Sequence, residues 1–220
     1  AAIGARGEVR PLYHAQKAYA DVIASYPWLL EAERATDCRL ALDLEMARSE
    51  RYCRGGDPFA VSGPEAWRFM LDGMLTTALC ASYAPTGVSL DAEDWIADSI
   101  TPLLVVAGTS MGRAKQERLV RYLEGGGRAL ITPLLPTLDE NLQPCSRLAD
   151  FLGAPTFRQA GRSSVRASIA GVSNVLYSQA FLTESLPESA VPLGHDERSR
   201  LPLAWELTTS GGGRAIVLGM

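Results

Sequence analysis

The stretch that decides the fold is TPLLVVAGTSMGRAKQERLVRYLEGGGRALITP, residues 101–133. An apolar run ends in a turn that contains glycine, a charged segment with helical periodicity follows, and three glycines lead into a second apolar run. Short apolar runs that alternate with an amphipathic segment are typical of a strand–helix–strand unit. The turn after the first strand could bind a phosphate, hold a nucleophile, or only connect two elements of scaffold.

The same alternation continues on both sides of this stretch. We expect a helix from Pro11, a strand at 38–44, a long helix from about residue 64 to residue 83, and a helix at 144–153. From about residue 163 on, short β-rich segments alternate with turns. This order predicts an α/β fold: a flavodoxin-like three-layer sandwich with a mostly parallel sheet and a strand-rich C-terminal part.

Two further features concern the organisation of the chain. We divide it into a helical lead-in, residues 1–36, and an α/β domain, residues 37–220. The segments GGGRALI (125–131) and GGGRAIV (211–217) echo each other, and each places glycines before a strand that we expect to be buried. Because their flanks differ, we do not interpret them as a repeat.

Composition excludes several classes of function. The 220 residues are 47% hydrophobic, which is enough apolar content to form a core. Their formal charge is −4, so we do not expect a basic surface that binds nucleic acid. No apolar run approaches the roughly 20 residues that span a membrane. The four cysteines are far apart, which favours neither a zinc site nor disulfides and fits a reducing, cytoplasmic location. The first residue is not Met and the last ones form a strand, so we expect a domain of a longer protein.

The phosphate interpretation of the turn fails on spacing. A phosphate-binding P-loop needs GxxxxGK[ST], whereas Gly108 and Gly112 enclose three residues and are followed by Arg113 and Ala114. No GxGxxG dinucleotide motif is present either. We therefore assign no cofactor, and the turn is interpreted as scaffold.

The nucleophile interpretation also fails. The α/β pattern resembles class I glutamine amidotransferases, in which a Cys follows a central strand within Gly-x-Cys-x-Gly. Here the strand GRALIT (127–132) is followed by Pro-Leu-Leu-Pro. Cys80 is expected to be a buried, inert thiol on the long helix. Cys145, near a helix start, has no identifiable base, because neither His14 nor His195 stands in a supporting motif.

Carboxylates are the remaining catalytic candidates, since glycosidases use two of them. By residue type the candidates are Asp43, Glu45, Asp94, Asp139, Glu140 and Glu206. Asp43 and Glu45 close a strand, where open α/β sheets place their sites, while residues 139–141 are typical of a solvated turn. We assign no catalytic residue and no metal ligand. As possible ligand or interface residues we single out Asp43, Gly108, Pro133, Leu134 and Leu135.

Four segments together resemble a known domain. They are residues 103–132, LDENLQPCSRLADFLGAP (138–155), GVSLD (87–91) and AWELTTSGGGRAIVLG (204–219). They are similar to the amidotransferase-like domain of bacterial β-galactosidases of glycoside hydrolase family 42, which is shared with family 35 relatives. The resemblance covers roughly residues 64–220. Gly108-Thr109 departs from it, because the family commonly has Pro there.

The resemblance implies a non-catalytic role. In those enzymes the catalytic glutamates lie on a preceding (β/α)8 barrel, which needs about 250 residues of its own. The domain builds the interfaces of a trimer and helps to wall the neighbouring active site. The implied partners are therefore further copies of the parent and the catalytic barrel of the same polypeptide, with no nucleic acid and no membrane. The alternative is a stand-alone sugar or small-molecule binding module that uses the strand ends near Asp43, Gly108 and Pro133.

The sequence gives its own, weaker indication of where an interface would lie. We expect the helix at 111–124 to be solvated, with these side chains outward: Arg113, Lys115, Gln116, Glu117, Arg118 and Arg121. Apolar residues concentrate instead at 27–35, around Trp95 and at 133–138. Singly, residues such as Trp28, Leu29, Leu30, Leu134 and Leu135 suit a core, but together they are numerous for loops and suit a contact surface.

Overall fold

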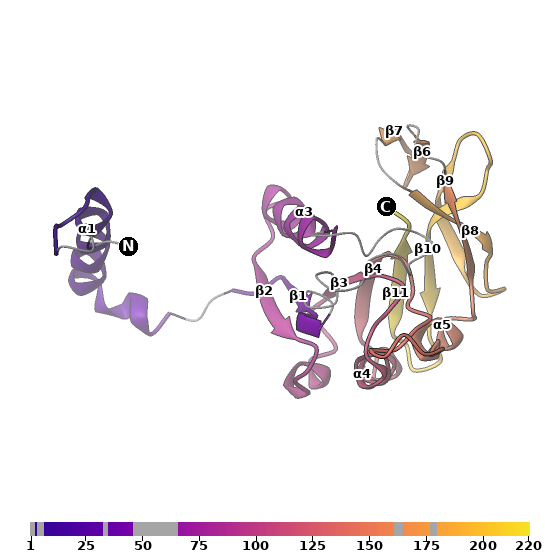
Figure 1. Ribbon diagram of the computed structural model, residues 1–220, viewed down its shortest axis with the longest axis horizontal. Coiled ribbons are helices and arrows are strands. Elements are labelled where there is room, and N and C mark those ends of the chain that lie inside the picture. The colour runs from indigo at the N-terminus through magenta and orange to yellow at the C-terminus, as the bar shows by residue number, and fades with distance from the viewer. Residues whose placement is uncertain (1–2, 4–6, 33–34, 46–65, 161–164, 177–179) are drawn as a thin grey trace. The chain divides into compact units, whose positions relative to one another are not determined.

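A computed structural model describes residues 3, 7–32, 35–45, 66–160, 165–176 and 180–220 (Figure 1). The chain separates into two compact units, Ala1–Ala35 and Thr36–Met220. The first unit contains helix α1 (Pro11–Ser25) and a single 3-10 turn, η1 (Pro27–Leu30). Pro11 begins α1, as expected for a residue that has no N–H to leave unpaired. The apolar segment that starts at residue 27 forms this short turn.

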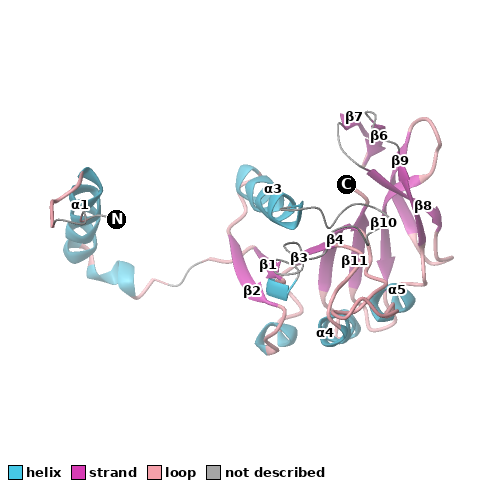
Figure 2. Ribbon diagram, in the orientation of Figure 1, coloured by secondary structure: helices cyan, strands magenta, loops and turns pink. Residues whose placement is uncertain are grey.

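The second unit combines a large sheet with helices on both of its faces (Figure 2). Its helices are α3 (Ala66–Cys80), η2 (Asp94–Ala97), α4 (Arg113–Glu124) and α5 (Arg147–Phe151). Its strands are β1 (Cys38–Leu42), β2 (Pro85–Ser89), β3 (Leu103–Ala107), β4 (Arg128–Pro133), β5 (Thr156–Ala160), β6 (Val165–Ile169), β7 (Val172–Leu176), β8 (Ala180–Ser185), β9 (Val191–Asp196), β10 (Pro202–Thr208) and β11 (Arg214–Leu218).

The described strands form a mixed sheet in the order β2-β1-β3-β4-β11-β10-β9-β6-β7, and β5 pairs with β8 separately. The pairings from β2 to β11 are parallel, and those from β11 to β7 are antiparallel. The predicted α/β class with a strand-rich C-terminal part is confirmed. The sheet is parallel in its first five strands only, because hairpin-like connections replace helical crossovers after α5.

The two GGGRA segments lie side by side in the sheet. Strand β11 pairs with β4 in parallel, with Arg214 opposite Arg128 and Val217 opposite Ile131. A Cβ on Gly213 would lie 2.0 Å from the carbonyl oxygen of Leu123, at the end of α4. Glycine before β11 therefore lets the backbone pass directly against α4, which accounts for part of the echo.

The core of the second unit lies between the sheet and the helices α4 and α5. Five side chains in this layer, from α4, α5 and the residue that follows α5, are fully buried: Leu119, Tyr122, Leu123, Leu148 and Leu152. They pack on Ile131, Trp205 and Val217 of the sheet. At about 1.5–3 kcal/mol for each large apolar side chain, this layer supplies much of the unit's hydrophobic stabilisation.

Helix α3 lies on the other face and is less completely packed. Met70, Leu71 and Met74 cover Val106 of β3. Leu75 and Leu79 of the same helix remain 36% and 55% exposed. The two faces of the sheet thus differ in how far the described residues cover them.

Candidate functional site

The carboxyl edge of the parallel strands is where an open α/β sheet places a ligand site. Asp43 follows β1, Gly108 follows β3, and Pro133 closes β4. Since these strands are parallel neighbours, their ends meet at one edge, which α4 enters at its first turn. The structure brings Asp43 to this helix, as the following contacts show.

Lys115 of α4 holds three carboxylates at this edge. Its Nζ donates to Asp43 Oδ1 at 2.7 Å and to Glu45 Oε2 at 2.9 Å, and lies 3.2 Å from Asp91 Oδ1. The side chains of Lys115 and Asp43 are only 2% exposed, while those of Glu45 and Asp91 are about half exposed. The cluster ties the ends of β1 and β2 to the first turn of α4.

The expectation that Lys115 and Gln116 point outward is wrong. Both are buried, with exposed fractions of 2% and 0%. Lys115 lies four residues before Leu119, which places it on the same buried stripe of the helix. This spacing is the signal in the sequence that could have revealed the buried lysine.

The electrostatics of Lys115 suit a structural role. Burial alone lowers its pKa, but the hydrogen bonds and charges of Asp43 and Glu45 outweigh this effect, so the pKa is raised above its ordinary value of 10.5. A lysine that acts as a general base needs a lowered pKa. Lys115 therefore stays protonated and paired at neutral pH.

The N-terminus of α4 is occupied by a carboxylate of the chain itself. Glu140 Oε2 accepts a hydrogen bond of 2.9 Å from the N–H of Arg113, the first helical residue. This hydrogen bond is the largest cause that holds the pKa of Glu140 below its ordinary value. A helix N-terminus is a natural anion site, and Glu140 fills this one.

Asp139 organises the neighbouring loop. Its Oδ1 accepts hydrogen bonds from the N–H groups of Gln143 and Asn141, and Arg113 lies 3.5 Å from Oδ2. The hydrogen bond from Gln143 is the first cause of a lowered pKa at Asp139. Asp139 is 5% exposed, so it is a buried loop cap and not the solvated turn residue that we expected.

Gln116 closes the space between α4 and the loop before α5. Its Nε2 donates to the carbonyl oxygens of Met111 at 2.8 Å and Cys145 at 3.1 Å. Cys145 is 7% exposed. The thiol considered as a nucleophile is thus enclosed in the scaffold.

The other predicted site residues are also buried. Gly108, directly after β3, and Pro133, the last residue of β4, are both buried. Leu134 packs with Phe181, and Leu135 belongs to the main core. In the part of the chain that the structure describes, all five residues singled out at this edge are therefore buried: Asp43, Gly108, Pro133, Leu134 and Leu135. Their role as ligand or interface residues stays a prediction.

The remaining candidates lie apart from this edge. Glu206 of β10 pairs with Arg214 of β11, and Asp94 is exposed on η2. Cys80, expected to be buried, is exposed at the end of α3, whereas Cys53 lies outside the described residues. Among the described residues, no group of three or more His, Cys, Asp or Glu side chains could hold a metal ion.

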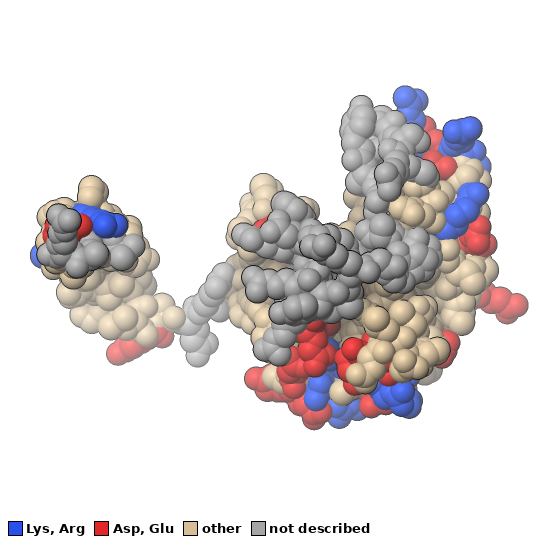
Figure 3. Space-filling model, viewed as in Figure 1, with Lys and Arg blue, Asp and Glu red and all other residues tan. Residues whose placement is uncertain are grey.

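The surface over η2, α4 and α5 carries both signs of charge. Acidic and basic side chains alternate there in the view of Figure 3. Arg118 and Arg121 both contact Glu93, and Arg147 contacts Glu117. This face offers no single-sign field of the kind that attracts nucleic acid. In the part of the chain that the structure describes, no helix is long and apolar enough to cross a membrane.

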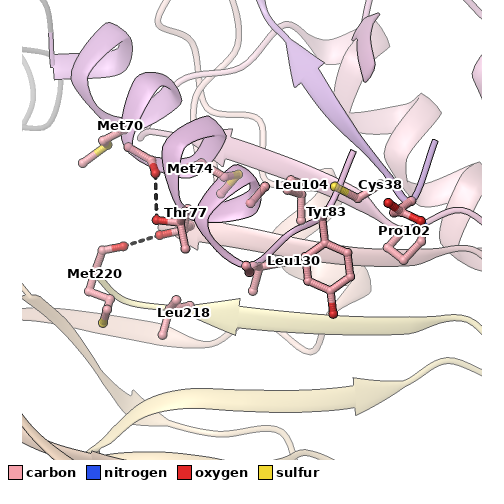
Figure 4. Close-up of a pocket in the computed structure, with 15 residues that line it drawn as sticks. Cys38, Met70, Met74, Thr77, Tyr83, Pro102, Leu104, Leu130, Leu218 and Met220 are labelled. Atoms are coloured by element: carbon pink, nitrogen blue, oxygen red, sulfur yellow. Dashed lines mark hydrogen bonds between the residues drawn. The ribbon is translucent and has the colours of Figure 1, made fainter. Parts of the chain in front are cut away.

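A cavity of about 560 Å³ lies between α3 and the sheet (Figure 4). Met70, Met74 and Thr77 line it from α3, and Leu104, Leu130 and Leu218 line it from the sheet. Cys38 lies at one end, and burial raises the pKa of its thiol. At the other end, Thr132 Oγ1 donates to the carbonyl oxygen of Met220. The cavity is apolar, so it suits a hydrocarbon or aromatic group better than a sugar, which requires convergent hydrogen-bonding groups.

The fold is that of a domain found in glycosidases. The chain superposes over its full length on a catalytic mutant of the family 42 β-galactosidase Gan42B from G. stearothermophilus, with a TM-score of 0.76 and 14% identity over 32% of that chain. A β-galactosidase from Rahnella sp. R3 gives a TM-score of 0.71 at 13% identity, over all of this chain and 34% of that one. At these identities the likeness concerns the fold. The predicted resemblance to a family 42 domain is confirmed.

The chain belongs to the family described as "GLMA-like, second domain", whose model matches residues 65–190, more than half of it. It is 29% identical over 226 aligned residues to an exo-β-D-glucosaminidase from Thermococcus kodakarensis. This alignment covers 99% of this chain and 28% of the relative. A second exo-β-D-glucosaminidase, from Pyrococcus horikoshii, is 50% identical over 56 residues, or 26% of this chain and 7% of the relative. The matches thus span less than a third of the length of these curated relatives.

Proposed function

We propose that this chain is a non-catalytic accessory domain, of amidotransferase-like fold, in a larger glycoside hydrolase. The observation that carries the proposal is the filled carboxyl edge of the sheet. There Lys115 is neutralised by Asp43 and Glu45, and Glu140 caps the helix that would otherwise attract an anion. A catalytic site needs groups with tuned pKa values that converge on open space.

The parent enzyme acts on β-linked sugars. The names of the curated relatives favour an exo-acting β-D-glucosaminidase, and the shared fold of family 42 enzymes keeps β-galactosidase as the second candidate. Hydrolysis of a chromogenic β-glucosaminide and of the matching β-galactoside by the whole polypeptide separates these two activities. Buried free thiols at Cys38 and Cys145 support a reducing, cytoplasmic setting.

The direct test is to assay the 220-residue chain with both substrates and with glutamine. We expect no turnover by the chain alone and turnover of a glycoside by the whole polypeptide. Turnover by the chain that is lost in Cys145→Ala would disprove the accessory role, because it would place a nucleophile within the domain.

Self-association is the second part of the proposal, with a trimer as the expected state of the parent. Its support within the second unit is the exposed apolar surface at Leu79, Tyr83 and Ile100, which are 55%, 55% and 79% exposed. Light scattering on the whole polypeptide measures this state. A strictly monomeric parent would exclude the oligomerisation role but leave the non-catalytic role standing.

The cavity beside α3 keeps a small-molecule binding module as the second candidate function. Calorimetric titration of the chain with galactose, glucosamine and an apolar aglycone such as nitrophenol tests it. Saturable heat that Leu130→Trp abolishes would favour this candidate, since that substitution fills the cavity. We expect no saturable heat with the sugars.

A further inference from the structure

The cavity between α3 and the sheet has two ends of different chemistry. Figure 4 shows Met70 and Met220 at one end and Cys38, Tyr83 and Pro102 at the other. Its volume of about 560 Å³ lies within the range of about 300–1,000 Å³ that is typical of small-molecule sites. Every described residue that lines it belongs to the second unit, so the chemistry of the lining is set within that unit.

Over most of its length, the described lining side chains have their polar atoms already paired. Thr77 Oγ1 donates to the carbonyl oxygen of Gly73 at 2.8 Å, and Thr132 Oγ1 donates to that of Met220. Burial raises the pKa of the Cys38 thiol, which therefore stays neutral. A hydrocarbon or aryl group fills such a space without losing hydrogen bonds, whereas a ligand rich in hydroxyl groups loses those that it made with water.

The end at Cys38 carries a negative charge. Asp37 is the only charged side chain among the described residues that line the cavity. Its Oδ2 accepts a hydrogen bond of 2.8 Å from the N–H of Ala84, and the residue is exposed to solvent. Because that set of lining residues includes no Lys or Arg, the carboxylate of Asp37 sets the sign of the charge at this end.

Two neighbours of Asp37 also favour a positive charge in the ligand. Tyr83 lines the cavity at the same end and is 55% exposed, and the face of an aromatic ring attracts cations. Helix α3 ends at Cys80, and Ala78 and Ala81, on either side of that helix end, line the cavity. A helix C-terminus carries a partial negative charge. The carboxylate, the ring and the helix end therefore favour a cation at the same place.

We propose that this cavity binds a small apolar molecule that ends in an ammonium group. The apolar part lies between α3 and the sheet, and the ammonium group lies beside Asp37 and Tyr83. This inference rests on the second candidate function, a small-molecule binding module, and adds the chemical class of the ligand. A sugar lacks the apolar part, and a fatty acid carries the wrong charge for this end.

Calorimetric titration of the 220-residue chain at low salt with three probes of matched shape tests the ligand class. The probes are phenylbutylammonium, phenylbutanol and phenylbutanoate. We expect the ammonium to bind about fivefold more tightly than the alcohol, as a cation does at a partly exposed aromatic and acidic site, and the carboxylate to bind most weakly. No saturable heat with any probe would overturn the site. Equal affinities for the ammonium and the alcohol, or tightest binding of the carboxylate, would overturn the ligand class.

Matched variants locate the charge that selects the ammonium. Asp37→Asn removes the charge but keeps an oxygen that accepts from the N–H of Ala84, so we expect the ammonium to bind within about twofold of the alcohol. Asp94→Asn is the control and should keep the preference, because it removes a carboxylate next to Trp95, which packs in the core on the other face of the sheet. Equal losses in both variants would contradict a role of Asp37. Leu130→Trp fills the cavity and should abolish the binding of all three probes; if it does not fold, the two Asn variants still decide.

The readouts separate this inference from the proposed function. Equal binding of the ammonium and the alcohol removes the inference and leaves a small-molecule binding module. Hydrolysis of a glycoside by the whole polypeptide tests the accessory role independently of the three probes.

Discussion

The two faces of the parallel sheet differ in how completely the described side chains cover them. On the closed side, which comprises α4, α5 and the carboxyl edge, Lys115, Gln116 and Tyr122 are buried and each has hydrogen-bond partners. On the open side, α3 leaves Leu79 exposed and an apolar cavity of about 560 Å³ beneath it. The difference teaches that, among the described residues, the edge which resembles an active site by position holds paired and buried polar groups, while exposed apolar side chains lie on α3.

The largest effect is expected when the buried charge cluster is broken. Lys115→Met keeps most of the side-chain volume but removes the buried ammonium group that the carboxylates of Asp43, Glu45 and Asp91 contact. The expected loss in the free energy of unfolding is about 3–5 kcal/mol. Urea unfolding measures it, with Arg121→Met as the control, because the contact of Arg121 with Glu93 is exposed to solvent, where screening leaves an ion pair little net contribution to stability. Similar losses for both variants would show that the charge cluster at the carboxyl edge stabilises the fold no more than an exposed ion pair does.

Leucine truncation compares the two sides directly. Leu123→Ala on α4 removes a fully buried side chain, and the expected loss is about 2–5 kcal/mol. Leu79→Ala on α3 should change the free energy of unfolding by less than about 0.5 kcal/mol, because its side chain is more than half exposed. A large loss at Leu79 would mean that something in solution covers the open side.

Adding a methyl group should change the free energy of unfolding in opposite directions on the two sides of the sheet. Gly213→Ala would place a Cβ 2.0 Å from the carbonyl oxygen of Leu123, so we expect a loss of about 1–3 kcal/mol. Gly73→Ala on α3 meets nothing within 4 Å and should gain about 0.5–1 kcal/mol from helix propensity. Thermal unfolding of the two variants gives the sign of each change in stability. Destabilisation by Gly73→Ala would contradict the claim that a Cβ at this position of α3 meets open space.

The smallest effect is the pH dependence of the carboxyl edge. The pKa values of Asp139 and Glu140 lie below their ordinary values of 3.8 and 4.5. A depressed carboxyl pKa stabilises the fold above the unfolded-state value, and this contribution is lost as pH falls through the folded-state value. Stability should therefore fall below about pH 4.5, and Asp139→Asn should flatten that slope. Denaturation series across the acid range measure the slope, and an unchanged slope in Asp139→Asn would contradict the prediction.

The sequence predicts this fold well where a pattern is local. The unit at 101–133 is confirmed as β3, α4 and β4, because its apolar runs, glycines and helical period all indicate one structure. The partners of Lys115 are different: Asp43 is 72 residues away and Asp91 lies on another loop. Only the parallel register of the strands brings them together, and sequence spacing does not encode that register.

Exposure was harder to predict than secondary structure. Lys115 and Gln116 have the composition of a solvated face, and burial depends on which turn of α4 meets the strand ends. Leu134 and Leu135 follow a strand like loop residues, yet the bent chain after β4 turns them into the core. Cys80 lies among apolar neighbours in sequence but ends α3 on its uncovered side.

The central claim is that the carboxyl edge is scaffold and that catalysis occurs elsewhere in the parent. The most direct measurement is the kcat of the whole polypeptide on a β-glucosaminide after the paired change Asp43→Leu with Lys115→Met. This change replaces the buried ion pair by apolar side chains, while the two carboxylates that also contact Lys115, those of Glu45 and Asp91, are about half exposed to water. The account predicts a kcat within about twofold of the unchanged enzyme. A folded variant whose kcat falls by about 100-fold or more, the loss expected when a general acid or base is removed, would contradict it.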